Sequence, residues 1–364
     1  MKILYITPDI TNSGGIARVI SLKTNYMISK LEYEVHILTI NNNDSDFFFP
    51  FNPKIQWFKI KQAKNALLFF LNYIRLIRKT ISNEKPDAII ICDAIFWVLI
   101  PWFIKTKAPI IFETHVSIYL KKVIKKGFLS SIRFSLVHFL KTITAKKFDK
   151  FVVLTAEACK QWNSNNCVII PNPVSFNSVS HAKLQNKKAI AICRHSYEKG
   201  LDRLLMIWKK VSEKHPNWTL DIIGEWNSDL KYQKLAGNLQ ISEYVNFIPP
   251  IIDIQKNYYE SSIFLMASRS EAFPLVLLEA MHMGLPCIAY DCPVGPKAII
   301  QNNKNGFLIE DGNKDSFVEK LSLLIKDENL RIQMGKKAIE SVEKYDLDTI
   351  MNQWKNLLES IVKT

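Results

Sequence analysis

The sequence predicts two doubly wound α/β domains of the Rossmann-like kind, each built on a parallel sheet. A chain of 364 residues is too long for one ordinary domain. Short apolar runs rich in β-branched residues alternate with segments of helical period, which is typical of parallel βαβ units. The alternation stops at one polar stretch, 175–188, and then resumes. We therefore interpret this stretch as the linker between two domains of the same kind.

In the first domain, the apolar runs are continuous rather than strictly alternating, as expected for strands that are buried on both faces. We expect strands at 3–7, 34–40, 55–60, 88–92, 110–113, 151–155 and 168–170. The segments between them have helical period and predict helices at 15–31, 64–83, 95–105, 121–147 and 156–162.

The second domain repeats this pattern. Strands are expected at 189–193, 219–223, 245–248, 263–266 and 287–290. Helices are expected at 201–214, 229–239, 253–260, 275–283, 297–301, 315–326, 329–344 and 348–362. Ligands of such sheets lie outside the carboxyl ends of the strands, so we predict a binding cleft between two facing domains.

The composition is that of a globular protein, because 48% of the residues are hydrophobic and 23% are charged. The run 88–104 is the nearest to a membrane span, but Asp93 and Pro101 interrupt it. The chain opens on a strand pattern without a cleavage site, so we expect a cytoplasmic protein. The six cysteines contain no C-x-x-C pair, which favours reduced, buried thiols and argues against a zinc site.

The net charge of +14 comes almost entirely from residues 1–178, which hold 24 Lys and Arg against 11 Asp and Glu. Its densest part, 121–148, has eight basic residues, no acidic one and many apolar ones. Such a segment could dock on an anionic membrane surface, or it could be a packed helix with a solvated cationic face. Both interpretations stay open. We expect no nucleic-acid partner, because no zinc finger, RRM signature or basic zipper is present.

Two glutamates, Glu271 and Glu279, are separated by seven residues around the start of the expected helix 275–283. Pro274 separates them, so Glu271 lies in the loop before the helix and Glu279 lies inside it. The free N–H groups of the first helical turn suit a phosphate, and a carboxylate suits a ribose diol. The plain alternative is a capping residue and a surface carboxylate. The apolar neighbours of Glu279 favour partial burial instead.

Arg194 and Lys199 follow the expected strand 189–193 and precede a helix. An arginine fork and a lysine point charge near a helix N-terminus are the groups that a diphosphate needs. Either cation alone would more often be a solvated surface charge.

Weaker candidates occur in the first half. Gly14 and Gly15 follow the first strand and would let backbone approach a ligand, although a plain tight turn is the simpler interpretation without further motifs. His115 follows the strand 110–113, and Asn172 lies on a rigid turn between two prolines. A lone histidine is more often structural than functional.

Together these motifs resemble the retaining nucleotide-sugar glycosyltransferases of the GT-B fold, in particular glycosyltransferase family 4 (GT4). The carriers are R-x4-KG at Arg194, Lys199 and Gly200, the E-x7-E motif within SEAFPLVLLEAMHMGLPCIAYD, and the later CPVGPKAII and NGFLIEDGN. The resemblance spans nearly the whole chain and is most specific in the carboxyl half.

For the carboxyl half, the resemblance implies that Glu279 binds the ribose and that Arg194 and Lys199 hold the diphosphate. The backbone N–H groups of Leu275 and Val276 would help them. The family usually has glycine at the positions of Cys193 and Ala272. Ala272 and Phe273 would therefore reshape the sugar pocket, which leaves the donor sugar open.

For the rest of the chain, the resemblance implies that Glu271 and His115 face the donor sugar. Gly14 and Gly15 would close over the phosphates from the other domain. Residues 1–178 would bind the acceptor, 179–345 the nucleotide sugar, and the helix in 346–364 would cross back to the first domain.

The expected function is transfer of a hexose or N-acetylhexosamine, with retention, from a UDP-sugar to a lipid-linked or polysaccharide acceptor. The pathway would be synthesis of capsule, O-antigen or exopolysaccharide. No metal or other cofactor is expected, because no D-x-D lies in a position to bind one. The alternatives are a UDP-sugar 2-epimerase on the same fold and a non-catalytic, membrane-associated nucleotide-sugar-binding scaffold.

Overall fold

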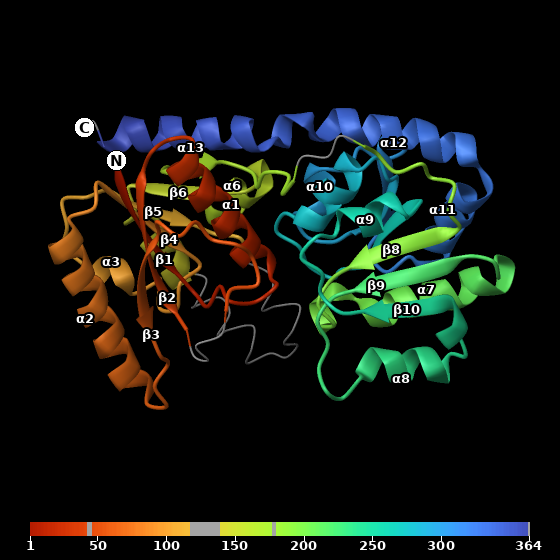
Figure 1. Cartoon of the computed structure of the whole chain (residues 1–364), viewed down its shortest axis with the longest axis horizontal. Coiled ribbons are helices and arrows are strands. Elements are labelled where there is room, and N and C mark those ends of the chain that lie inside the picture. The colour runs from red at the N-terminus through yellow and green to blue at the C-terminus, as the bar shows by residue number, and fades with distance from the viewer. Residues whose placement is uncertain (42–45, 117–138, 177–179, 363–364) are drawn as a thin grey trace. The chain divides into compact units, whose positions relative to one another are not determined.

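The computed structural model describes residues 1–41, 46–116, 139–176 and 180–362. These residues form two compact units. The first takes 1–116, 139–173 and 347–362, and the second takes 174–176 and 180–346. Each unit is built on one parallel sheet flanked by helices (Figure 1), which confirms the predicted fold class.

The first unit has a seven-stranded sheet in the order β3-β2-β1-β4-β5-β6-β7, and all its strand pairs are parallel. The order changes direction between β1 and β4, which is the topological switch point of the sheet. The strands are β1 (Lys2–Thr7), β2 (Glu34–Ile40), β3 (Gln56–Ile60), β4 (Ala88–Cys92), β5 (Ile110–Glu113), β6 (Lys150–Val153) and β7 (Cys167–Ile169). The helices are α1 (Gly15–Ser29), α2 (Ala66–Glu84), α3 (Ile100–Phe103), α6 (Ala156–Trp162) and α13 (Leu347–Val362).

The second unit has a six-stranded parallel sheet in the order β10-β9-β8-β11-β12-β13. Its switch point lies between β8 and β11. The strands are β8 (Lys188–Ile192), β9 (Thr219–Ile223), β10 (Val245–Ile248), β11 (Ile263–Met266), β12 (Cys287–Asp291) and β13 (Gly306–Glu310). The helices are α7 (Leu201–Lys214), α8 (Lys231–Asn238), α9 (Gln255–Tyr259), α10 (Leu275–His282), α11 (Lys314–Lys326) and α12 (Glu328–Val342).

The helix α13 packs on the first unit by its apolar face. Trp354 and Leu358 are buried, and the Tyr26 hydroxyl of α1 donates to Asp348 Oδ1 at 2.7 Å. The period of this segment, with apolar residues three and four apart, explains why one face is buried.

The described part of the expected linker is packed against the second unit. The Ala182 amide donates to Met283 O, and the Arg331 guanidinium donates to Leu184 O. Leu184 is buried. The described part of this stretch therefore packs as part of the second unit, although its polar composition indicated little to bury.

The structure differs from the expected elements in three places. The helix expected at 297–301 is only a 3-10 turn at Pro296–Ala298. The helix expected at 95–105 is reduced to α3, because Phe96 adopts a positive φ of 60° and Pro101 lies in the first turn. The strand β13 was missed. Most of the helix expected at 121–147 lies outside the described residues. In its described part, residues 139–145 are helical. Among the described residues, no helix is long and apolar enough to span a bilayer.

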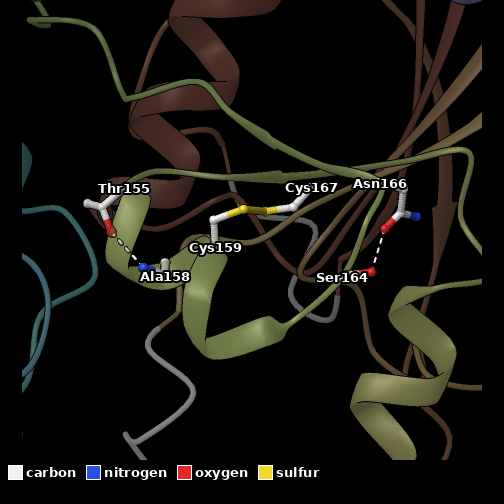
Figure 2. Close-up of a disulfide and its surroundings, with 6 residues drawn as sticks. All are labelled: Thr155, Ala158, Cys159, Ser164, Asn166 and Cys167. Atoms are coloured by element: carbon white, nitrogen blue, oxygen red, sulfur yellow. Dashed lines mark hydrogen bonds between the residues drawn. A yellow bond between two sulfur atoms is a disulfide. The ribbon is translucent and has the colours of Figure 1, made fainter.

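The expectation that all cysteines are reduced is wrong for one pair, because Cys159 and Cys167 form a disulfide (Figure 2). Thr155 caps α6 by accepting from the Ala158 amide, which fixes the helix on which Cys159 lies. Cys167 opens the neighbouring strand β7, and the two Cα atoms lie 6.0 Å apart. Neither the spacing nor a sequence motif marks this pair.

Candidate functional site

The candidate site of the second unit lies at the carboxyl ends of β8 and β11, which flank the switch point of its sheet. Arg194 and Lys199 follow β8, and Lys199 lies in a short 3-10 turn before α7. Glu271 follows β11 and precedes α10. The topology therefore brings two motifs that are 72 residues apart to one edge of the sheet.

Lys199 and Glu271 form a close ion pair. Lys199 Nζ donates to Glu271 Oε1 at 2.8 Å and to Oε2 at 3.0 Å, and Ser268 Oγ donates to Oε1 at 2.7 Å. Burial alone would lower the pKa of Lys199, but the Glu271 carboxylate raises it above its ordinary value. The lysine is therefore a permanent cation at neutral pH.

Two glycines allow the close packing of this edge. Gly200 has a φ of +66°, and a Cβ on it would meet Ala267 O at 2.0 Å. A Cβ on Gly224 would meet Cys193 O at the same distance. A side chain at either position would therefore push apart the strand ends that carry Arg194, Lys199 and Glu271.

Arg194 is more exposed to solvent than Lys199 and Glu271. Its side chain is 60% exposed, and Nη2 lies 3.6 Å from Glu198 Oε1. It also interacts electrostatically with Lys199 and Cys193. Burial raises the pKa of the Cys193 thiol to about 12, so this thiol is neutral.

The helix α10 begins directly after this group. The amides of Leu277 and Leu278 are the first to bond within the helix, to Pro274 O, and those of Leu275 and Val276 precede them. The start of the helix therefore presents N–H groups with partial positive charge beside Glu271. The Phe273 ring is buried against Tyr345, at 5.5 Å between ring centroids, so its side chain serves packing.

Glu279 is completely buried. Its Oε2 accepts from the Tyr258 hydroxyl at 2.8 Å, and its Oε1 accepts from Ser175 Oγ at 2.5 Å. A ribose diol would reach this carboxylate by taking over hydrogen bonds that these two hydroxyls make. Its predicted role as the ribose ligand stays a prediction.

The first unit places its candidates after the carboxyl ends of β1, β5 and β7. Gly14 caps α1, and its amide donates to Asn12 Oδ1 at 2.8 Å. A Cβ on Gly14 would lie 2.6 Å from that oxygen, so a larger residue at this position would displace the Asn12 side chain. Gly15, the first residue of α1, is exposed.

His115 lies two residues after β5, and its Nε2 is 2.9 Å from Glu113 Oε1. Cys92, Glu113 and His115 form a group of potential metal ligands whose atoms lie within 4.8 Å of one another. Asn172 is buried between its two prolines. That Gly14, Gly15, His115 and Asn172 serve the same donor as the second unit stays a prediction.

Several polar residues at these two edges were not singled out from the sequence: Ser268, Tyr258, Ser175, Lys23, Glu113 and Asp93. One of them had a usable signal. Lys23 lies at a helical spacing from Val19, Ile20 and Met27, so it occupies an apolar face on which a lysine must be paired.

Comparisons with known proteins show the family of this chain. A family model described as Glycosyl transferases group 1 matches residues 176–341. An uncharacterized glycosyltransferase of Haemophilus influenzae is 30% identical over 98% of this chain and 99% of its own length. The amylovoran biosynthesis glycosyltransferase AmsD of Erwinia amylovora is 27% identical over the same shares of both chains.

Among solved structures, a mutant of TarM from S. aureus, in complex with UDP, α-GlcNAc-glycerol and Fondaparinux, has a TM-score of 0.79. It is 16% identical and covers 98% of this chain and 99% of its own. The relative that is 30% identical over nearly the whole chain shows the class, and the solved structure shows the fold. The chain belongs to the glycosyltransferases of the GT-B fold.

Proposed function

We propose that this protein moves a hexose or an N-acetylhexosamine from a UDP-sugar to a hydroxyl of a lipid-linked or polysaccharide acceptor, with retention at the anomeric carbon, as in family GT4. The observation that carries the proposal is the Lys199–Glu271 pair beside the start of α10, at the switch point of the second sheet. The similarity to AmsD, an amylovoran biosynthesis glycosyltransferase, and to TarM, which was solved in complex with UDP, supports a polysaccharide pathway and a uridine diphosphate.

The chemistry follows from the charges. The barrier lies in separating an oxocarbenium-like sugar from a departing diphosphate, and fixed positive groups stabilise the charge that develops. Two of the three N–H groups of Lys199 are directed at Glu271, which leaves one for a phosphate oxygen. Arg194 and the amides of Leu275 and Val276 supply the further positive charge. By resemblance, the leaving phosphate acts as the base.

Glu271 has two tasks in this proposal. It holds Lys199 in place, and it faces the donor sugar, as the resemblance implies. Glu279 takes the ribose, while Gly14, Gly15 and His115 contact the donor from the first unit. Because protein cations occupy the role that Mg²⁺ has in other transferases, we propose that no metal is required.

A donor screen tests this function. UDP-glucose, UDP-galactose and their N-acetyl forms are incubated with the full-length protein, and release of UDP is measured with and without EDTA. We expect slow hydrolysis of one donor, faster turnover with an acceptor glycan, and equal rates in EDTA. Strong inhibition by EDTA would contradict metal independence, and turnover of none of the four donors would contradict the donor class.

The products separate the remaining alternatives. A 2-epimerase would release an epimerised free sugar without any acceptor, and the relatives named above are glycosyltransferases, which gives that alternative no support. A non-catalytic scaffold would be stabilised thermally by UDP but would not hydrolyse any donor.

We also propose that the first unit docks on an anionic membrane at the inner face of the plasma membrane, where a lipid-linked acceptor would lie. Phe139 and Leu140 are 60% and 49% exposed, and Trp102 is 57% exposed. Lys147 Nζ lies 4.0 Å from the Trp102 ring centroid, so a cationic group and an exposed apolar group are in contact there. Such a mixture suits an anionic lipid surface.

Vesicle co-sedimentation checks this docking. Binding to vesicles with anionic lipid should exceed binding to neutral vesicles and should weaken in salt. The variant Phe139→Ser/Leu140→Ser should bind at least about tenfold less, because burial of each side chain is worth ~1.5–3 kcal/mol. Met206→Ser is the matched control, since Met206 is 48% exposed on α7 of the second unit. Equal binding to neutral and anionic vesicles would refute the proposal.

A further inference from the structure

A polar cluster in the first unit contacts His115 through Glu113 and Asp93. It joins Lys23 of α1, Glu113 at the end of β5, Asp93 after β4 and Trp354 of α13. The mechanism proposed above uses none of these four residues. Their burial and mutual contacts therefore need another explanation.

The centre of the cluster is an ion pair. Lys23 Nζ donates to Glu113 Oε1 at 2.6 Å and to Oε2 at 2.7 Å, and the two side chains are 1% and 2% exposed. Burial alone would raise the pKa of Glu113, but Lys23 and His115 lower it to about 2. Desolvation makes a buried pair weak evidence for stability, so its presence suggests a role in fixing a geometry.

Glu113 Oε1 also faces His115 Nε2 at 2.9 Å. A carboxylate only accepts hydrogen bonds, so Nε2 must carry the proton. The Asp93 carboxylate holds the turn that carries His115 by two hydrogen bonds. Asp93 Oδ2 accepts from the His115 backbone amide at 2.6 Å, and Asp93 Oδ1 accepts from Thr114 Oγ1 at 2.8 Å. Asp93 has a φ of +43°, a conformation that persists only where surrounding contacts hold it.

Lys23 links this turn to two helices. Its Nζ lies 3.6 Å from the centroid of the Trp354 ring on α13, a close cation–π contact. Lys23 itself lies on α1, which begins at Gly15. The contacts of Lys23 therefore connect the orientation of His115 to α1, which begins at Gly15, and to α13.

A metal is the competing explanation, because Cys92, Glu113 and His115 have ligand spacing. However, both oxygens of Glu113 already face the Lys23 ammonium, which would repel a divalent ion. Burial also raises the pKa of Cys92, which opposes the thiolate that a metal would need. The cluster therefore fits a neutralised carboxylate better than a metal site.

We propose that Glu113 is a positioning residue: its carboxylate, paired with Lys23, holds the His115 imidazole as the Nε2–H tautomer in the orientation that meets the transferred sugar. This inference rests on the proposed function for the role of His115. The hydrogen bond and the tautomer can be tested without that function.

Two double variants of the full-length protein separate positioning from stability. Lys23→Met/Glu113→Gln and Lys23→Met/Glu113→Leu both remove both charges, so neither leaves a buried charge unpaired. They differ at one position, where the glutamine side chain retains an acceptor for His115 Nε2–H and the leucine side chain has none. Each pair is also made in a His115→Ala background.

The first readout is ¹⁵N NMR of the histidine side chains. His115 should be a single Nε2–H tautomer in the wild type and in Lys23→Met/Glu113→Gln, which we call the Gln pair. It should lose this preference in Lys23→Met/Glu113→Leu, which we call the Leu pair. The second readout is kcat with the donor found in the screen. The Leu pair should be up to about 10²-fold slower than the Gln pair, with a similar KM for the donor. In the His115→Ala background, the two pairs should have equal kcat.

The same tautomer and the same kcat in both pairs would overturn the proposal. So would a difference in kcat that persists without His115, since Glu113 would then act by another route. If the wild type turned over no donor but the NMR difference remained, the proposed function would fail while the positioning bond stood.

Discussion

Replacement of Arg194 or Lys199 by alanine should lower kcat by about 10²–10³-fold, the usual cost of removing one preorganised donor from a developing anion. The reason is the lost neutralisation of the departing diphosphate. Initial rates with the donor found in the screen give the effect. Arg194→Ala is the cleaner of the two, because its side chain is 60% exposed and its loss should not affect folding.

The matched control is Lys234→Ala, an exposed lysine on α8 of the same unit. It should retain wild-type kcat, because α8 does not belong to the edge that carries Lys199 and Glu271. Lys199→Ala also deprives the Glu271 carboxylate of its cation while Ser268 still donates to it, so its thermal unfolding is measured in parallel. Full activity of an Arg194→Ala/Lys199→Ala double variant would exclude the phosphate clamp.

Lys23→Met should destabilise the first unit by about 3–5 kcal/mol, the cost of leaving one partner of a buried ion pair uncompensated. The double variant Lys23→Met/Glu113→Gln removes both charges and should lie close to the wild type. Urea unfolding at pH 7 compares the two. Equal destabilisation by the single and the double variant would show that the lysine acts through packing and not through its charge.

The same pair predicts a pH dependence. The folded-state pKa of Glu113, about 2, is below its ordinary value of 4.5. The contribution of Glu113 to the free energy of unfolding is therefore fully present above pH 4.5 and is lost as the pH falls toward 2. The Lys23 ammonium and the His115 imidazole face this carboxylate, and the neutral Tyr5 and Cys92 face it from β1 and β4. The stability of the wild type relative to the double variant should therefore decrease across that window.

The sheets could be predicted from the sequence because strands buried on both faces read as continuous β-branched runs, as at Ile89, Ile90 and Ile91. Segments whose structure depends on tertiary contacts could not. The helical period at 95–105 did not reveal the positive φ of Phe96. The polar composition of 175–188 concealed the contacts of Leu184 and Ala182 with the second unit.

The candidate site was predictable only in parts. Arg194, Lys199 and Glu271 each belonged to a motif, but the pairing of Lys199 with Glu271 depends on β8 and β11 being neighbours. The burial of Glu279 under Tyr258 and Ser175 is likewise a matter of topology. The Lys23–Glu113 pair spans 90 residues, and only the position of Lys23 on an apolar helix face indicated that it must have a partner.

The claim that Arg194, Lys199 and the start of α10 bind a diphosphate is tested most directly by calorimetric titration with UDP and with UMP. In the wild type, UDP should bind about 10–100-fold more tightly than UMP, because the second phosphate gains charge-assisted hydrogen bonds. In Arg194→Ala/Lys199→Ala, this preference should fall close to one. An unchanged preference for UDP in that variant would contradict the account.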